Sequence, residues 1–149
     1  MKKEFQDYLT AISLSKVMQE AIIAKYKMLI WAANVEELDD IFLSEIVSQS
    51  GNREYFSIWG FTPTLFCKIT ISKEADKDKI VLFKLKQNIA RYTINDTNYD
   101  LININNNTFI ETTVRTFDMD IPYFLKASGA NCNHLVQISR KYFIANLNT

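Results

Sequence analysis

The first 50 residues contain neither proline nor glycine, and apolar side chains recur through them at the spacing of a helix face. From Tyr55 onward the pattern changes to short runs rich in β-branched and aromatic residues, which polar turns separate. Helices followed by a run of strands are typical of an α+β domain, because parallel α/β folds alternate the two elements. We therefore expect an α+β fold in a single domain over residues 1–149.

Apolar spacing predicts one long helix from about Lys3 to about Ala33, with a kink around Ser13–Ser15. Its expected apolar face consists of Phe5, Leu9, Ile12, Leu14, Val17, Met18, Ala21, Ile22 and Leu29, widened by Tyr26 and Ile30. A helix of this length packs across a whole sheet or pairs with a second copy of itself. A homodimer is therefore one of our expectations.

A second helix is predicted from Asn34, because Asn34 and Glu37 have the spacing of a capping box. We expect it to end before Gly51, a residue suited to a helix C-terminus. The acidic residues of its first turns are Glu36, Glu37, Asp39 and Asp40. The positive end of the helix dipole stabilises carboxylates there, and a site for a cation or a basic partner is the alternative.

The remaining apolar runs predict one curved antiparallel meander of five or six strands. The expected strands are residues 55–61, 64–72, 79–87, 89–94, 99–104 and 108–117. Residues 64–72 and 79–87 form a hairpin around the charged turn 73–78, while Asn-rich turns are expected at 95–98 and 105–107. We expect the N-terminal helices to pack on one face of this sheet.

The C-terminal segment is expected to begin with a short helix from Asp120 to Ala127, which Gly129 ends. Residues 133–147 fit a helix better than a closing strand, which stays the alternative. Two helices followed by a meander resemble, in topology, the cone-shaped nuclear-transport-factor-2-like group. That resemblance implies a small-ligand-binding domain or a carboxylate-dependent enzyme.

The formal net charge is zero, which argues against a dedicated nucleic-acid-binding domain. Residues 1–50 nevertheless carry five lysines and eight acidic residues, so this segment has a charge of −3 and the remainder +3. The N-terminus lacks the pattern of a signal peptide, and the apolar stretch Met28–Val35 is far too short for a membrane span. We expect a cytoplasmic protein with no membrane partner.

The residues that commonly carry catalysis are scarce. His134 is the one histidine, and the two cysteines are Cys67 and Cys132. Cys67 falls on the expected core face of a strand, where a free cysteine is usually a small buried hydrophobe. A Cys67–His134 nucleophile pair and a metal site that includes Cys132 are the weaker alternatives. We expect no cofactor and no metal, and the sequence leans against an enzyme.

Charged side chains on the predicted strands have two interpretations each. Glu111 and Arg115 lie opposite the apolar face of their strand, which favours a surface ladder over a pocket. Lys84, Lys86, Arg91 and Tyr92 interleave basic and aromatic groups as single-strand nucleic-acid binders do. Lysines that protect a sheet edge explain the same pattern, and zero net charge favours that explanation.

Aromatic residues fall on both faces of strand 55–61. Tyr55, Trp59 and Phe61 share one face, while Phe56 and Ile58 share the other. This pattern indicates either burial on both sides or an exposed aromatic patch that binds a partner.

Two functions follow from these features. The first is a small interaction protein that binds another macromolecule, as inhibitors, immunity proteins and chaperone-like proteins do. Its expected partner-binding residues are Glu36, Glu37, Asp39, Asp40, Tyr55 and Trp59. The alternative is a cone-shaped domain with a cavity of roughly 300 Å³ or more between sheet and helices. Its expected lining is Trp59, Phe83, Tyr92 and Glu111.

Overall fold

The computed structural model describes residues 1–47, 53–70, 79–100, 102–118 and 122–147, although the side chains of 46–47 and 53–56 are not among them. The elements are α1 (Lys3–Ala11), α2 (Lys16–Ala33), β1 (Asp40–Val47), β2 (Arg53–Phe61), β3 (Leu65–Thr70), β4 (Lys79–Lys84), β5 (Ile89–Asn98), β6 (Phe109–Thr116), β7 (Tyr123–Ser128) and α3 (Asn131–Ile138). A π-helical turn (Ser139–Phe143) and a 3₁₀ turn (Ile144–Asn146) continue α3. The predicted α+β class is confirmed.

The strands form two antiparallel sheets, ordered β1-β2-β3-β4 and β5-β6-β7, so the predicted single meander is wrong. The chain leaves the first sheet between β4 and β5. Gln87 has a left-handed φ of 58° there, and the Asn88 side chain donates a hydrogen bond of 2.7 Å to the carbonyl of Lys84. This turn carries β5 away from β4 instead of pairing it with β4.

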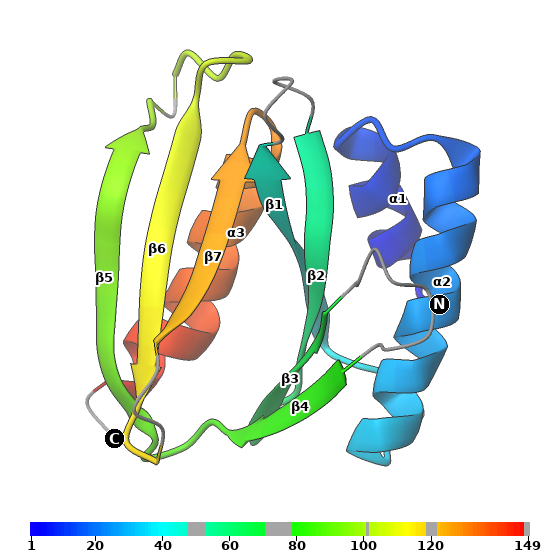
Figure 1. Ribbon diagram of the computed structural model, residues 1–149, viewed down its shortest axis with the longest axis vertical. Helices are drawn as coiled ribbons and strands as arrows, with labels where there is room; N and C mark the ends of the chain where they lie inside the picture. Colours follow the sequence, from blue (N-terminus) through cyan, green and yellow to red (C-terminus); the bar gives the residue numbers. More distant parts are fainter. Residues whose placement is uncertain (48–52, 71–78, 101, 119–121, 148–149) are drawn as a thin grey trace.

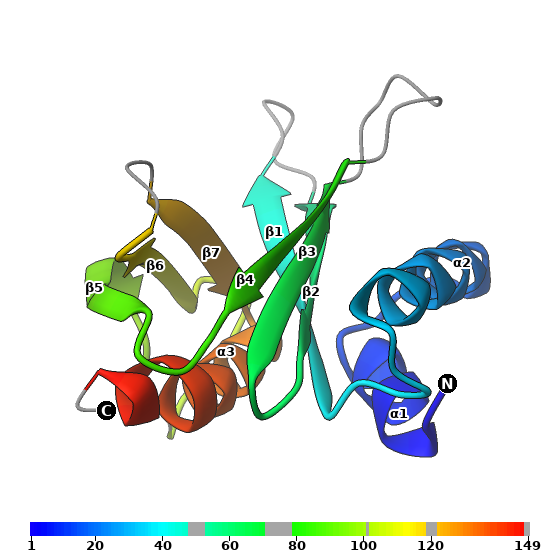
Figure 2. The same ribbon diagram turned by 90° about the horizontal axis from the view of Figure 1, so that it is seen from below.

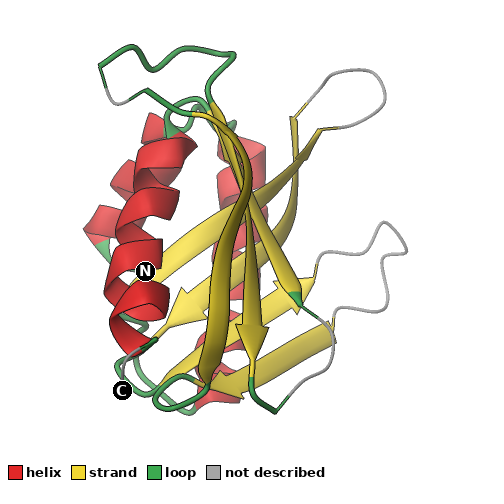
Figure 3. Cartoon of the chain, turned by 90° about the vertical axis from the view of Figure 1, so that its left-hand side faces the viewer, coloured by secondary structure: helices red, strands yellow, loops and turns green. Residues whose placement is uncertain are grey.

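The two sheets meet where β1 lies beside β7 (Figure 1). Side chains link them: Ser44 Oγ accepts a hydrogen bond of 3.1 Å from the Lys126 amide, and Ser128 Oγ donates one of 2.6 Å to Glu45. Figure 3 shows the strands of the two sheets running in clearly different directions. The change of direction between the sheets leaves a space on one side, which α3 occupies.

The helices form two layers around the first sheet. Figure 2 shows α1 and α2 on one side of β1–β4 and α3 on the other, between the two sheets. The first sheet is therefore covered on both faces. This explains why Ile41, Phe42 and Leu43, three consecutive residues of β1, are all fully buried.

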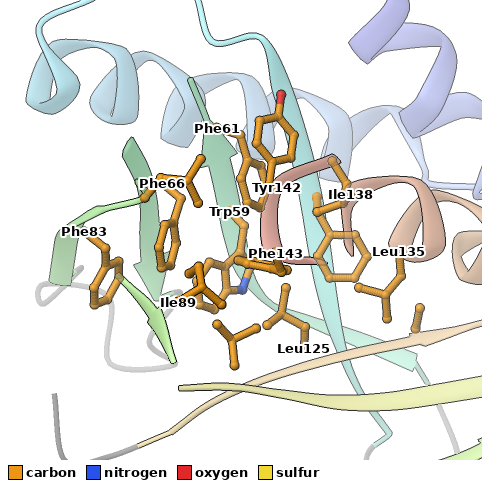
Figure 4. Packing of buried hydrophobic residues seen from close by; sticks show 14 of the residues in the cluster. Trp59, Phe61, Phe66, Phe83, Ile89, Leu125, Leu135, Ile138, Tyr142 and Phe143 are labelled. Carbon is orange, nitrogen blue, oxygen red and sulfur yellow. The ribbon is translucent and has the colours of Figure 1, made fainter. Parts of the chain in front are cut away.

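Aromatic side chains fill the core between the two sheets and α3 (Figure 4). Trp59 is fully buried there, the rings of Phe66 and Phe83 stack with centroids 4.7 Å apart, and those of Phe61 and Tyr142 stack at 4.5 Å. Leu85, Ile89, Ile110, Val114, Leu125, Ala127, Leu135, Ile138 and Phe143 complete this core with Phe42 and Cys132.

A second core lies between the first sheet and the helices α1 and α2. The helices contribute Phe5, Tyr8, Leu9, Ile12, Ile22, Tyr26 and Leu29, and the strands and the loop before them contribute Leu38, Ile41, Leu43, Ile58, Cys67 and Ile69. The Leu38 side chain packs directly on the main chain of Gly60, where an added Cβ would lie 2.4 Å from Leu38 Cδ1.

The predicted long helix is broken at the kink. Ser13 adopts a left-handed φ of 64°, and the Ser15 side chain accepts a hydrogen bond of 3.2 Å from the Met18 amide. Ser15 is thus an N-cap that starts α2 afresh. The chain reverses between the two helices, so they lie side by side against the sheet (Figure 1).

The predicted capped helix from Asn34 is wrong. Asn34 ends α2 in the left-handed conformation, and the amide of Val35 bonds to the carbonyl of Ile30. Asn suits a helix C-terminus as well as an N-cap, because its side chain tolerates positive φ. A loop follows Asn34, and strand β1 begins at Asp40; its apolar side chains match helical spacing because they are buried on both faces of the strand.

The turn predicted at 95–98 is wrong. β5 continues to Asn98 through a bulge between Ile94 and Asp96, so no turn forms at 95–98. The predicted strand 99–104 is absent from the described part of this segment. The Asp100 carboxylate instead accepts a hydrogen bond from the Ile102 amide, an arrangement that forms a turn.

In the C-terminal segment, one prediction is wrong and one is confirmed. The short helix expected from Asp120 to Ala127 is strand β7, which pairs with β6 along its length; Asp120 itself lies outside the described residues. Helix rather than closing strand is confirmed for most of 133–147.

The hairpin β3–β4 and strands β2 and β6 are also confirmed, while the charged turn 73–78 lies outside the described residues.

Candidate interaction surface

The predicted acidic residues lie in the connection between α2 and β1. Glu36, Glu37 and Asp39 are exposed there, at the C-terminal end of α2, whose dipole adds negative potential. Asp40, the first residue of β1, is half-buried. We call Glu36, Glu37, Asp39 and Asp40 the acidic corner.

Asp40 is held by the C-terminal segment. Its carboxylate accepts a hydrogen bond of 2.8 Å from Lys141 Nζ and another from the Tyr142 phenol. Burial first, and then the bond to Asp40, raises the pKa of Tyr142, so the phenol stays neutral and donates. The same carboxylate raises the pKa of Lys141. Asp40 thus helps to fix the end of the chain, and the other three carboxylates face solvent.

The predicted aromatic members of the partner site lie elsewhere. Trp59 is fully buried and its indole N–H donates a hydrogen bond of 3.1 Å to Ser57 Oγ. Ile58 is buried in the opposite core, so burial on both faces is the explanation that holds for this part of β2. The side chains of Tyr55 and Phe56 lie outside the described residues.

The four residues of the predicted ligand pocket do not line a common cavity. Trp59 and Phe83 are packed in the filled aromatic core, and Tyr92 packs against it with its ring stacked on that of Phe143. Glu111 lies on the opposite face of β6, where its carboxylate is 3.9 Å from Lys126 Nζ. Glu111 thus lies on the outer surface of the second sheet, beside Lys126 of the adjacent strand.

The basic residues near Tyr92 do not share a face with its ring. Lys84, Lys86 and Arg91 are exposed, whereas the Tyr92 ring faces the core and its hydroxyl lies 2.5 Å from Ser139 Oγ. Burial raises the pKa of Tyr92. An aromatic platform for stacked bases would need an exposed ring, and Tyr92 does not supply one.

Cys67 and His134 have different neighbours. Cys67 is buried between β3 and the helices, its thiol donates to the Gly60 carbonyl at 3.6 Å, and burial raises its pKa to about 12. His134 stacks on Tyr8 with centroids 3.8 Å apart and donates from Nε2 to the Ile41 carbonyl at 2.5 Å. Burial lowers the pKa of His134, so both groups are neutral near pH 7. They serve packing here.

A shallow depression of about 230 Å³ lies where the end of α1 meets the 104–106 segment and the start of α3. Its lining includes Ile12, Ser13, Asn105, Gly129 and Asn131. The side chain of Asn131 is already engaged, because it accepts from the Tyr8 hydroxyl at 2.6 Å and donates to the Leu43 carbonyl at 2.8 Å. The depression offers a ligand few uncommitted buried groups.

The solvent side of α2 carries an apolar stripe. Val17 is 76% exposed, Met28 39% and Trp31 81%, and Ala21 and Ala24 between them are also exposed. These five residues recur every three or four positions, so they form one stripe along the helix. We call Val17, Ala21, Ala24, Met28 and Trp31 the α2 outer face. Contiguous exposed apolar patches are typical of interaction sites.

The local fold explains why this stripe is exposed. α2 buries Ile22, Tyr26 and Leu29 against the sheet, and this set lies on the opposite side of the helix. Glu20 and Lys27 are exposed along one flank of the α2 outer face. The helix is therefore apolar on two opposite sides, of which the fold covers one.

The sequence interpretation missed this surface. It assigned Val17 and Met18 to the core face, where the structure has both exposed, and it gave no role to Trp31. The signal was present: positions 17, 21, 24, 28 and 31 have the three-four spacing of a helix–helix seam, beside the separate seam 22, 26 and 29. Two seams on one helix are typical of a helix that packs on both sides.

Membrane-spanning helices, metal sites and known relatives are features that can identify a function. No helix in the described ranges has the length and apolar character needed to cross a membrane. Among the same residues, no three His, Cys, Asp or Glu side chains gather closely enough to hold a metal ion. No protein-family model, curated protein or solved structure matches the chain.

Proposed function

We propose that this chain is an interaction protein that acts by binding another protein molecule, and that the α2 outer face is its main contact surface. The observation that carries the proposal is the exposure of Trp31 and Val17 on one helix face, at 81% and 76%. Tryptophan is among the residues that contribute most energy to protein interfaces when a partner buries it. Inhibitors, immunity proteins and chaperone-like proteins act through binding of this kind.

The acidic corner extends this surface in the proposal. Glu36, Glu37 and Asp39 follow within a few residues of Trp31, beyond the C-terminal end of α2. Carboxylates at the rim of an apolar contact select a partner surface that carries lysine or arginine and speed its approach. The partner chemistry is therefore an apolar patch with basic residues at its border.

Two further observations support binding over small-ligand chemistry. Aromatic side chains fill the core between the sheets and α3, and a cone-shaped domain would hold its ligand in such a space between sheet and helix. Cys67 and His134, two buried groups with nucleophilic or basic chemistry, are neutral and committed to backbone carbonyls.

Site-specific photo-crosslinking in the native host tests the proposal. A photoreactive phenylalanine analogue replaces Trp31, and in a matched control it replaces Phe124, which is 57% exposed on the outer side of β7. We expect a discrete adduct from position 31, and little from position 124. Equal yields at both positions, or none at position 31, would overturn the proposal.

A further inference from the structure

The α2 outer face has the form of a helix-pairing seam. Its two central residues, Ala21 and Ala24, are small, and Val17, Met28 and Trp31 lie toward its ends. Small central residues let a second helix approach closely, while larger residues on either side of the crossing point pack around it. The occupant that this shape fits best is therefore another α-helix.

The charges beside the seam indicate which helix. Glu20 and Lys27 lie on the same flank, two turns apart, and neither has an ion-pair partner among the described residues. A two-fold axis near residues 21–24 places Glu20 of each copy beside Lys27 of the other. The flank is thus complementary to itself, as an interface between identical subunits must be.

We infer that the partner of the α2 outer face is a second copy of this chain, with the two α2 helices antiparallel. The inference rests on the proposed function and names the partner of the same surface. In this pairing Ala21 and Ala24 lie at the crossing point, and Val17 of one copy lies toward Met28 of the other. Antiparallel helices also place opposite dipole ends side by side.

The expected dimer is weak. α2 has 18 residues, so it is about 27 Å long. One pair of helices of that length buries less surface than the roughly 1,200 Å² of a standard stable interface. We expect dissociation in the micromolar range, with monomer and dimer in rapid exchange.

Variants that exchange the charges of Glu20 and Lys27 test the pairing. Their dimerisation is measured by sedimentation velocity at chain concentrations of about 1 to 300 µM, a range that brackets micromolar affinity. The wild-type chain is expected to shift toward twice its monomer mass with concentration. Glu20→Lys and Lys27→Glu should each weaken dimerisation by about tenfold, because two exposed attractions become repulsions. The double variant Glu20→Lys/Lys27→Glu should return to within about twofold of wild type.

Lys86→Glu is the matched control, because it makes the same charge change at an exposed site away from α2, and it should dimerise as wild type does. A wild-type chain that stays monomeric at the highest concentration would overturn the inference, as would a double variant that is not rescued. Rescue of Glu20→Lys by Lys25→Glu instead would show a parallel pair and overturn the antiparallel arrangement.

The two failures are distinguishable. A monomeric purified chain together with a position-31 adduct to a different protein would overturn the second-copy inference and leave the proposed function standing. The absence of any adduct at position 31 would overturn the proposed function itself.

Discussion

The Tyr8 hydroxyl in α1 donates a hydrogen bond of 2.6 Å to Asn131 at the start of α3, and so joins the first helix to the last. The same hydroxyl accepts a bond of 3.0 Å from the Leu43 amide, and Asn131 donates back to the Leu43 carbonyl. These three residues form a closed, buried ring of hydrogen bonds around β1. Because α1 and α3 lie on opposite sides of the first sheet, this ring ties together the layers of the fold.

Tyr8→Phe removes the shared hydroxyl and leaves buried groups on Leu43 and Asn131 without that partner. We expect the free energy of unfolding to fall by about 1–3 kcal/mol, the cost of unsatisfied buried polar groups. Urea denaturation followed by circular dichroism measures the change. Tyr92→Phe, which removes a half-buried hydroxyl on another element, serves as a comparison. An unchanged midpoint for Tyr8→Phe would contradict this account of the ring.

Gly60→Ala tests the close approach of β2 to the loop before β1. The added Cβ would lie 2.4 Å from Leu38 Cδ1 and 3.0 Å from Cys67 Sγ, so fully buried neighbours must shift. We expect a loss of about 1–3 kcal/mol in the free energy of unfolding. Leu38→Ala alone should cost about 2–5 kcal/mol.

The double variant Gly60→Ala/Leu38→Ala gives the sharper measurement, because the truncated Leu38 leaves room for the new methyl group. Its loss should be smaller than the sum of the two single losses. Strictly additive losses would show that the two positions are not in steric contact.

The stability of the fold should fall as the pH drops below about 6.5. Burial lowers the pKa of His134 from its usual 6.5 in the folded state, so the unfolded chain binds a proton that the folded chain does not. The contribution of neutral His134 to the free energy of unfolding is complete above pH 6.5. It is lost as the pH falls from there toward the pKa of His134 in the folded state. The measurement is the free energy of unfolding at pH 7.5 and at pH 5.5, for wild type and His134→Gln.

His134→Gln should be less stable at pH 7.5, because it loses the stacking on Tyr8, but its stability should change less between the two pH values. An equal pH dependence in both proteins would assign the effect to other groups.

The two tryptophans should respond oppositely to truncation. Trp31 is 81% exposed and Trp59 fully buried. We expect Trp31→Ala to leave the free energy of unfolding within about 0.5 kcal/mol of wild type, while Trp59→Ala costs about 3–5 kcal/mol. Chemical denaturation checks both. A large loss from Trp31→Ala would mean that the side chain packs within its own chain and is not free for a partner.

The sequence predicted those elements whose pattern had one structural meaning. Alternation between core and polar residues in 64–72 and 79–87 identified the hairpin β3–β4, because period two fits only a strand. The apolar positions of 133–147 likewise fitted α3 better than a strand.

The errors fall where one residue type suits two structures. Asn34 fits a helix start and a helix end, and the deciding fact is the burial of Phe42 and Leu43 in opposite cores, a long-range property. Asn95 looked like a turn residue, but its side chain donates to Thr113 across the bulge in β5. The α2 outer face could not be separated from the core face by sequence, because both sets of apolar residues have helical spacing and only the fold decides which set is covered.

Disulfide trapping of Ala24→Cys is the most direct measurement of the central claim, that the α2 outer face of one copy of this chain pairs with that of a second copy. Cys67 and Cys132 are fully buried, so the introduced thiol is the reactive one. A disulfide requires Cα atoms roughly 4.4–6.8 Å apart, a distance reached at the crossing point of two close helices. The matched control is Ala145→Cys, at an exposed site beyond α3.

Under mild oxidation at micromolar concentration, we expect Ala24→Cys to form a reducible covalent dimer at least about ten times faster than Ala145→Cys, because pairing holds the two thiols together. A folded Ala24→Cys protein that stays monomeric, or that cross-links no faster than Ala145→Cys, would contradict the claim.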